Sequence, residues 1–517
     1  MNPLRRTCLA GLVGLALAGC ASLPAQAPRP IEVGIESWES TALGRTAAES
    51  LRDEPEGSSG FRLLTTAGQA LDARLSLIAS AQRSIDLQYH ELRVDRTGGA
   101  ILNALREAGE RGVRVRVLLD DLLTAGQDEV LLGLAAIPNV DVRLFNPFGV
   151  PRGSNWIRLI GSIGRMDRLT RRMHNKLFVA DNAIAVSGGR NIADEYLMPP
   201  GGLGVIDIDV LTAGPVVRSL TRDFDRYWNS AICYPVETLV VPRLDPDEAR
   251  KAFDRALARL APLPPTLLPG LWPGSLLAEL DARRIALSTG QAMTYADPPE
   301  KIARDAPVRT GRATGNVVAA LFDTRKEIMI ATPYLIPGAA GIVAMRQTLA
   351  KGRELTIITN SLASTDEPMV HQAYALYRSD LLTAGAQVYE LSPGNGTADL
   401  TADPLIGPGR LQSRITVVDR SRVYFGSMNL DGRSARLHTE LGLIIDSPAL
   451  AEQVLTLFSV DRREGVYQVR FRPGTNELEW VTWRGGNPVV YSREPETSWY
   501  ERTRLWLSAP FISSDLL

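Results

Sequence analysis

His174 and Lys176 are the two residues of this chain whose types and spacing could handle a phosphate group. They lie two positions apart, so on an extended strand both side chains leave the same face. The apolar run Leu177–Ala180 continues that strand to Asp181, and Asn191 follows a glycine pair where a ligand can approach the backbone closely. A nucleophilic imidazole beside an ammonium group, with a carboxylate and an amide nearby, predicts a phosphate-handling site.

The same pattern recurs in the second half of the chain, but without its histidine. The first copy runs from His174 to Asn191 and the second from Gln412 to Asn429, and each spans 17 positions (191 − 174 and 429 − 412). The corresponding residues are His174 and Gln412, Lys176 and Arg414, Asp181 and Asp419, and Asn191 and Asn429. We therefore predict two structurally similar halves.

Short apolar segments alternate with segments of helical periodicity along most of the chain. Strands are expected at 84–89, 113–119 and 140–145, and helices at 67–81 and 100–111. This alternation predicts an α/β fold with a largely parallel or mixed sheet.

The N-terminus has the features of an export signal. Arg5 and Arg6 precede a short apolar run that ends in Leu-Ala-Gly-Cys at Cys20. This ending resembles the bacterial lipobox, whose cysteine is lipidated, although an ordinary cleaved signal shares the basic and apolar regions. We expect a membrane-anchored lipoprotein of the bacterial envelope that faces the periplasm. The outer membrane is favoured because Ala21, and not an aspartate, follows the cysteine.

The predicted domain division follows these patterns. The stretch 262–274 is dense in proline and glycine, which break helix and strand, so it marks a connector. The predicted segments are a lipoprotein signal peptide at 1–19, a lipidated tether and linker at 20–57, a first half at 58–235, a connector at 236–305, and a second half with a C-terminal extension at 306–517.

Composition narrows the classes of function. The formal net charge is −1, so the chain as a whole does not attract nucleic acid. After Cys8 and Cys20 only Cys233 remains, which leaves no disulfide within the mature chain. Because the chain has only four histidines, a multi-histidine metal site is not expected, and no cofactor is predicted.

The duplicated motif resembles that of the phospholipase D superfamily. The first copy has the pattern HxKxxxxD followed by GGxN, and further segments such as VRVLLDDL, TPYLIPG and GSMNLDGRSARLHTELG match one subgroup. That subgroup contains bacterial cardiolipin synthases, including those that use phosphatidylethanolamine. The resemblance covers about residues 35–510.

The resemblance implies two α/β/α halves packed together around one active site and a reaction without metal. It implies that His174 attacks a phosphodiester to form a phosphohistidine, with Lys176 and Asp181 as the other candidate catalytic residues, although an ordering role is favoured for Asp181. The second motif histidine of the family protonates the leaving alcohol. The expected substrates are phosphatidylglycerol and phosphatidylethanolamine at a membrane surface. The residues expected to bind phosphate are Lys176, Asn191, Arg414 and Asn429, and the carboxylates expected to orient the imidazoles are Asp207 and Glu440.

The second motif departs from the family because it reads Gln412, Arg414 and Asp419. A neutral amide donates and accepts hydrogen bonds but cannot serve as a general acid, a role typically worth ~10²–10⁴-fold in rate. His371 or His438 could replace the missing histidine, although a structural role is favoured for each.

Four functional interpretations remain. The first is a phospholipase D-type transferase or hydrolase that works with one intact motif. The second is a catalytically impaired relative that still binds anionic phospholipid. Pairing of two chains is disfavoured because the second half would block it, so a monomer is expected. A nuclease is disfavoured by the lipid anchor and the whole-length resemblance, so nucleic acid is not an expected partner.

Overall fold

The fold is taken from a computed structural model of the chain. It describes residues 23–26, 28–149, 152, 169–198, 205–240, 244–270, 274–302, 312–393, 409–460 and 464–508. The predicted signal peptide and Cys20 lie outside these residues. Within the described residues, no helix is both long and apolar enough to cross a membrane.

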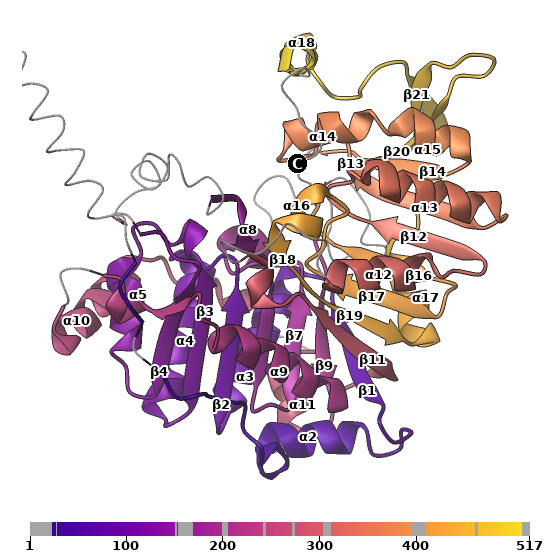
Figure 1. The fold of residues 1–517 in the computed structure, drawn as a ribbon. Helices are drawn as coiled ribbons and strands as arrows, with labels where there is room; N and C mark the ends of the chain where they lie inside the picture. Colours follow the sequence, from indigo (N-terminus) through magenta and orange to yellow (C-terminus); the bar gives the residue numbers. More distant parts are fainter. Residues whose placement is uncertain are drawn as a thin grey trace, which may run out of the picture.

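Two eight-stranded sheets with the same strand order form the centre of the molecule (Figure 1). In the first half each strand pairs with the next in the order β10, β4, β3, β2, β6, β7, β9 and β1. In the second half the order is β20, β14, β13, β12, β16, β17, β19 and β11, which is the same sequence ten labels later. The two sheets join where β1 pairs antiparallel with β11.

The strands of the first sheet are β1 (Ser59–Leu64), β2 (Ser84–Tyr89), β3 (Arg114–Asp120), β4 (Val140–Phe145), β6 (Leu177–Ala180), β7 (Ile184–Gly188), β9 (Asp209–Ala213) and β10 (Cys233–Pro235). Those of the second are β11 (Ser288–Ala296), β12 (Glu327–Ala331), β13 (Glu354–Asn360), β14 (Gln387–Leu391), β16 (Ile415–Val418), β17 (Arg422–Gly426), β19 (Leu441–Asp446) and β20 (Val466–Phe471). A C-terminal meander adds β21 (Leu478–Arg484) and β22 (Asn487–Tyr491).

Helices flank both sheets (Figure 1). The helices up to the second sheet are α2 (Ala42–Ser50), α3 (Ala67–Ser80), α4 (Arg96–Glu110), α5 (Asp128–Ala135), α8 (Asp194–Leu197), α9 (Pro215–Trp228), α10 (Pro246–Leu257) and α11 (Leu276–Asp281). The later helices are α12 (Arg312–Phe322), α13 (Gly338–Ala350), α14 (Pro368–Ala375), α15 (Arg378–Ala384), α16 (Gly432–Arg436), α17 (Pro448–Leu457) and α18 (Trp499–Ser508).

Strands β2, β3 and β4 pair in parallel and are largely buried. Polar residues alternate with their apolar ones, and the buried Asp86 and Arg116 form an ion pair at 2.6 Å. In β3 every residue after Arg114 is buried, and β2 is buried throughout. Helices α3 and α4 bury Leu71, Ile101 and Leu105 against this sheet. The predicted α/β fold with two similar halves is therefore confirmed.

The predicted boundary of the second half is corrected by the strand order. β11 lies within the segment 236–305 that was expected to be a connector, yet it is the counterpart of β1 and pairs with β19. The second half therefore starts at Ser288 and not at residue 306. The alternating burial of β11 is weak, with most of its residues half-buried, so its sequence does not stand out as a strand.

Candidate active site

Two short parallel strand pairings place the start of each motif against the opposite half of the molecule. β5 (Arg172–Met173) pairs with β18 (His438–Thr439), and β8 (Val205–Ile206) pairs with β15 (Arg410–Leu411). The His174 amide then donates to the Thr439 carbonyl at 2.9 Å, and the Gln412 amide donates to the Ile206 carbonyl at 2.8 Å. Each motif residue thus lies beside the carboxylate that follows in the opposite half, Glu440 or Asp207.

The second half holds the imidazole of His174 in one orientation. Its Nδ1 lies 3.0 Å from the Ser427 carbonyl oxygen and 3.1 Å from Glu440 Oε2, and both oxygens can only accept a hydrogen bond. Glu440 is itself fixed, because its Oε2 accepts from Ser427 Oγ and its Oε1 accepts from Ser434 Oγ at 2.7 Å. Nδ1 therefore carries the hydrogen, and Nε2 is left with the lone pair that a nucleophile needs.

Burial, together with the nearby Lys176 and Arg414 charges, lowers the pKa of His174 well below its usual value. The imidazole is therefore neutral at pH 7. A neutral imidazole is the nucleophilic form.

The two cations of the motifs occupy equivalent positions. Lys176 Nζ donates to the His174 carbonyl at 2.8 Å, and Arg414 donates from one terminal nitrogen to the Gln412 carbonyl at 2.7 Å. Arg414 Nε also donates to Asn429 Oδ1 at 2.7 Å. Burial and the neighbouring Arg414 lower the pKa of Lys176 well below its usual value. Two cations held close together in a buried site would be stabilised by a bound anion.

These groups line one cavity of about 410 Å³ between the halves. The sequence-predicted residues that line it are His174, Lys176, Asn191, Gln412, Arg414 and Asn429. The structure therefore brings both motifs together at a single site.

Asp181 and Asp419 do not line this cavity. Asp181 accepts hydrogen bonds from the backbone amides of Gln82, Arg83 and Ser84, just before β2. Asp419 accepts equivalent bonds from three backbone amides and Thr324 Oγ1, just before β12. Both carboxylates fasten a hairpin turn to the start of a neighbouring strand. This geometry corrects the inclusion of Asp181 among the catalytic candidates and agrees with an ordering role.

The Gln412 side of the cavity has a different network from the His174 side. Gln412 Nε2 donates to Asp366 Oδ2 at 3.1 Å, and the Tyr334 hydroxyl donates to Asp366 Oδ1 at 2.8 Å. Asp207, the counterpart of Glu440, accepts from the Ile208 amide through Oδ1, while its buried Oδ2 has no partner among the described residues. Burial raises the pKa of Asp207 to about 6. The carboxylate expected to orient an imidazole is in place, and the imidazole is missing.

Two further histidines lie beside His174. The ring centroids of His90 and His438 are 5.4 Å and 5.7 Å from that of His174, and both side chains line the cavity. His438 Nδ1 has no partner among the described residues. Both rings lie on the His174 side of the site, whereas Gln412 marks the opposite side. Neither therefore stands where the second motif histidine would.

The remaining histidine, His371, is buried elsewhere in the second half, 3.6 Å from Glu494. The favoured structural role is consistent with this position. Sequence reasoning did not select His90, and the one signal for it is its place directly after the β2 strand.

His174, His438 and Glu440 bring three potential metal-ligand atoms within 4.8 Å of one another. Lys176 and Arg414 share the cavity, and their charges oppose a cation there. The residues fit an anion better than a metal ion.

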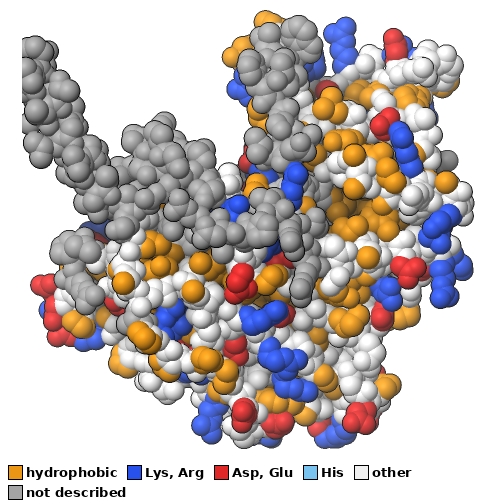
Figure 2. All heavy atoms as spheres, viewed as in Figure 1, with side chains coloured by type: hydrophobic (Ala, Val, Ile, Leu, Met, Phe, Trp, Pro, Cys, Tyr) orange, Lys and Arg blue, Asp and Glu red, His pale blue; other side chains and the backbone are white. Residues whose placement is uncertain are grey.

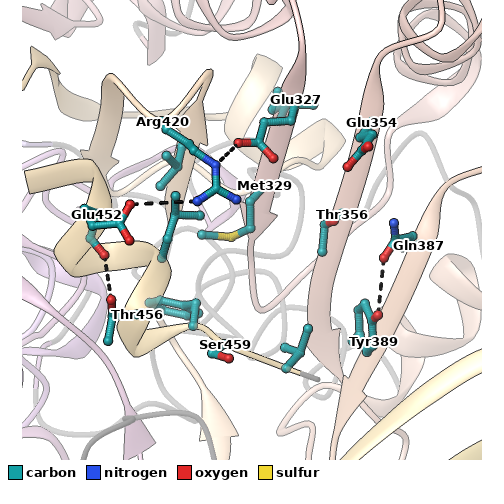
Figure 3. Close-up of a pocket in the computed structure, with 15 residues that line it drawn as sticks. Glu327, Met329, Glu354, Thr356, Gln387, Tyr389, Arg420, Glu452, Thr456 and Ser459 are labelled. Carbon is teal, nitrogen blue, oxygen red and sulfur yellow. Dashed lines mark hydrogen bonds and ion pairs between the residues drawn. The ribbon is translucent and has the colours of Figure 1, made fainter. Parts of the chain in front are cut away.

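A separate cavity of about 580 Å³ lies against β12, β13 and β14 (Figure 3). None of the motif side chains that line the His174 cavity lines this one, and its Arg420 is ion-paired with Glu327 and Glu452. Nothing in this cavity provides a nucleophile of the His174 kind.

The fold and the site define a class, namely a two-motif phosphodiester site built between duplicated α/β halves. The family model described as "Cardiolipin synthase, PLD-like domain" matches residues 75–228 and 317–462. The chain therefore belongs to the phospholipase D superfamily, in the family of cardiolipin synthase PLD-like domains.

Individual relatives span most of the chain. Cardiolipin synthase C of Escherichia coli K12 is 31% identical over 480 residues, covering 90% of this chain and 97% of its own. Cardiolipin synthase A of Pseudomonas fluorescens SBW25 is 25% identical over 429 residues, covering 81% of this chain and 73% of its own. The crystal structure of phosphatidylserine synthase from Haemophilus influenzae Rd KW20 matches with a TM-score of 0.56 at 14% identity, covering 90% of this chain and 97% of that one. This last likeness supports the fold.

Proposed function

We propose that the protein transfers or hydrolyses the phosphatidyl group of membrane phospholipids through a phosphohistidine at His174, in the manner of a cardiolipin synthase. The observation that carries this proposal is the fixed, neutral imidazole of His174, held by Glu440 from the opposite half beside Lys176 and Arg414. The relatedness to cardiolipin synthases supports a phospholipid as the substrate.

The first step forms a bond between His174 Nε2 and the phosphorus and breaks a phosphorus–oxygen ester bond. Lys176, Arg414 and Asn429 stabilise the negative charge that develops on the phosphoryl oxygens. The departing alkoxide takes its proton from water, because the Gln412 amide has none to give. In the second step an incoming alcohol or water forms a new phosphorus–oxygen bond, releases Nε2 and loses its proton to water.

The absence of a second motif histidine predicts slow turnover. A phospholipid-binding protein of low activity is therefore the second candidate. The hydrogen bond from Gln412 to Asp366 favours it, because this bond holds a neutral amide in the place where the general acid would stand.

The experiment is incubation of the purified protein with phosphatidylglycerol vesicles, with and without phosphatidylethanolamine, followed by lipid mass spectrometry. We expect cardiolipin or phosphatidic acid to form, and neither to form with the His174→Ala variant. Absence of both products from the wild-type protein, with retained binding to the vesicles, would favour the second candidate.

We further propose that the protein is attached to the bacterial envelope through lipid on Cys20. The Cys20→Ser variant should then leave the membrane fraction. Retention of that variant in membranes would contradict lipid anchoring.

A further inference from the structure

A third, mainly apolar cavity lies in the second half between α12, α13 and α16. Its volume is about 600 Å³, within the ~300–1,000 Å³ range of small-molecule sites. Figure 2 shows hydrophobic side chains gathered on this face of the second half, in the region of α13 and α12. Its apolar lining includes Val318, Phe322, Ile336, Ala340, Ala344 and Met345.

The apolar cavity shares a wall with the cavity of about 410 Å³ that contains His174, which we call the phosphate pocket. Asn429, whose Oδ1 accepts from Arg414, lines both. On α16, Arg433 lines the phosphate pocket and Ala435 lines the apolar cavity. A molecule held at Arg414 therefore has an apolar space on the other side of Asn429.

The equivalent space in the first half is filled. Three leucine or isoleucine side chains there are fully buried in the core, and smaller residues that line the cavity replace all three in the second half. Leu71 and Thr314 each lie 13 positions before the first residue of β2 or β12 (84 − 71 and 327 − 314). Ile101 and Gly341 each lie 11 positions before Gly112 or Gly352 (112 − 101 and 352 − 341). Leu197 and Ala435 each lie 6 positions after Asn191 or Asn429 (197 − 191 and 435 − 429). The cavity therefore results from specific large-to-small differences between the halves.

The cavity wall is open at Gly315 and Gly338 but not at Gly341, where an added Cβ atom would lie 2.7 Å from Pro337 Cβ. A Cβ atom added at Gly315 or at Gly338 would meet no described atom within 4 Å, whereas one added at Gly99 of α4 would lie 2.4 Å from Leu260 Cδ1. Nearby, the side chains of Val343 and Leu376 are 52% and 73% exposed. An apolar ligand could enter here from a hydrophobic surface.

We propose that this cavity holds a fatty-acyl chain of the phospholipid whose phosphate occupies the His174 pocket. The inference rests on the proposed function. A phospholipid presents an anionic phosphodiester next to long apolar chains, and the protein presents two buried cations next to an apolar cavity across one asparagine. Chain burial would then contribute binding energy that a soluble headgroup lacks.

The test fills the cavity and compares long-chain with short-chain lipid. Ala344→Leu extends into the cavity from α13, and Ala435→Leu restores the residue type found at Leu197. Ala319→Leu, on an exposed position of α12 outside the cavity lining, is the matched control. Circular dichroism and thermal melts confirm that all three variants fold.

We expect both cavity variants to lower kcat/KM for dioleoyl phosphatidylglycerol by at least about tenfold, the usual effect of mismatched bulk in an apolar pocket. Their kcat/KM for dihexanoyl phosphatidylglycerol should stay within about twofold of wild type, as should both values for the control. Equal losses on both lipids, or no loss on either, would overturn the acyl site. Failure of the wild-type protein to turn over either lipid would instead contradict the proposed function.

A binding measurement tests the cavity without turnover. Phosphatidylglycerol carrying a diazirine near the end of an acyl chain is presented in vesicles to the His174→Ala protein, irradiated, and the labelled peptides are identified. Labelling of α12, α13 or α16, reduced by Ala344→Leu, supports the proposal. Labelling confined to other elements, such as α18, would contradict it.

Discussion

Replacing Gln412 by histidine should raise the rate on natural phospholipids, because the structure retains the partner that a histidine at this position would need. Asp207 lies in the opposite half at the place equivalent to Glu440, and its Oδ2 has no partner among the described residues. A histidine at 412 could donate Nδ1–H to this carboxylate, as His174 does to Glu440. In its imidazolium form its Nε2–H would then face the leaving oxygen and could donate the proton.

The expected gain follows from the size of general acid catalysis. Protonation of a leaving alkoxide by a positioned imidazole is typically worth ~10²–10⁴-fold. At about 1.4 kcal/mol per tenfold, that is about 3–5 kcal/mol of barrier. The substitution also removes the hydrogen bond from Gln412 to Asp366, a loss of about 1 kcal/mol that subtracts little from the gain.

The assay compares two leaving groups. With phosphatidylglycerol the leaving alkoxide is strongly basic and needs a proton, whereas phosphatidyl-p-nitrophenol releases a stable phenolate that does not. Gln412→His should raise kcat/KM at least about 100-fold on the first lipid and only a few-fold on the second. Gln412→Asn is the control that keeps an amide, and Gln412→His combined with Asp207→Asn should lose most of the gain. An equal gain on both lipids would show that residue 412 affects binding, and no gain would refute the argument that proton transfer limits the reaction.

Three further predictions follow from burial and hydrogen bonding. The lowered pKa of His174 keeps its imidazole neutral below pH 6.5, so kcat/KM for phosphatidyl-p-nitrophenol should not fall between pH 7 and pH 6; a decline with an apparent pKa near 6.5 would contradict it. The pKa of Asp207 is raised from 3.8 to about 6, so its ionisation costs stability as the pH rises from about 4 to 6, and Asp207→Asn should raise the Tm at pH 7.5 but hardly at pH 4. A Tm gain of the same size at both pH values would exclude this explanation. Asp181→Ala leaves three backbone amides without their acceptor and should cost on the order of 3 kcal/mol of unfolding free energy, measured by urea denaturation; a change below about 0.5 kcal/mol would argue against an ordering role.

The sequence was sufficient to predict the fold and the motif residues that line the His174 cavity. Repetition of the His174 motif at Gln412 predicted two halves, and the alternation of strand-like with helical segments predicted the strands β2, β3 and β4. The motif spacing also selected Lys176 and Arg414, which the structure places in one cavity.

Other features depend on contacts between distant segments and could not be predicted. β11 pairs with β1 and β19 through its backbone, and its weak burial pattern left it in the expected connector. His90 reaches the cavity only because β2 ends beside β6. The apolar cavity arises from side-chain volumes that differ between the halves, such as those of Ile101 and Gly341. The sequence alone does not show that these positions face the same space between the helices.

The central claim, that His174 forms a covalent phosphatidyl intermediate, is tested most directly by a rapid-quench measurement with phosphatidyl-p-nitrophenol. The first step needs no general acid with this substrate, and the second step lacks a base at Gln412, so the intermediate should accumulate. We predict a burst of p-nitrophenolate equal in amount to the enzyme, with the phosphatidyl group on the peptide containing His174 after an alkaline quench, and no burst with His174→Ala. Steady release of p-nitrophenolate without a burst or adduct, or an adduct on a different residue, would contradict the account.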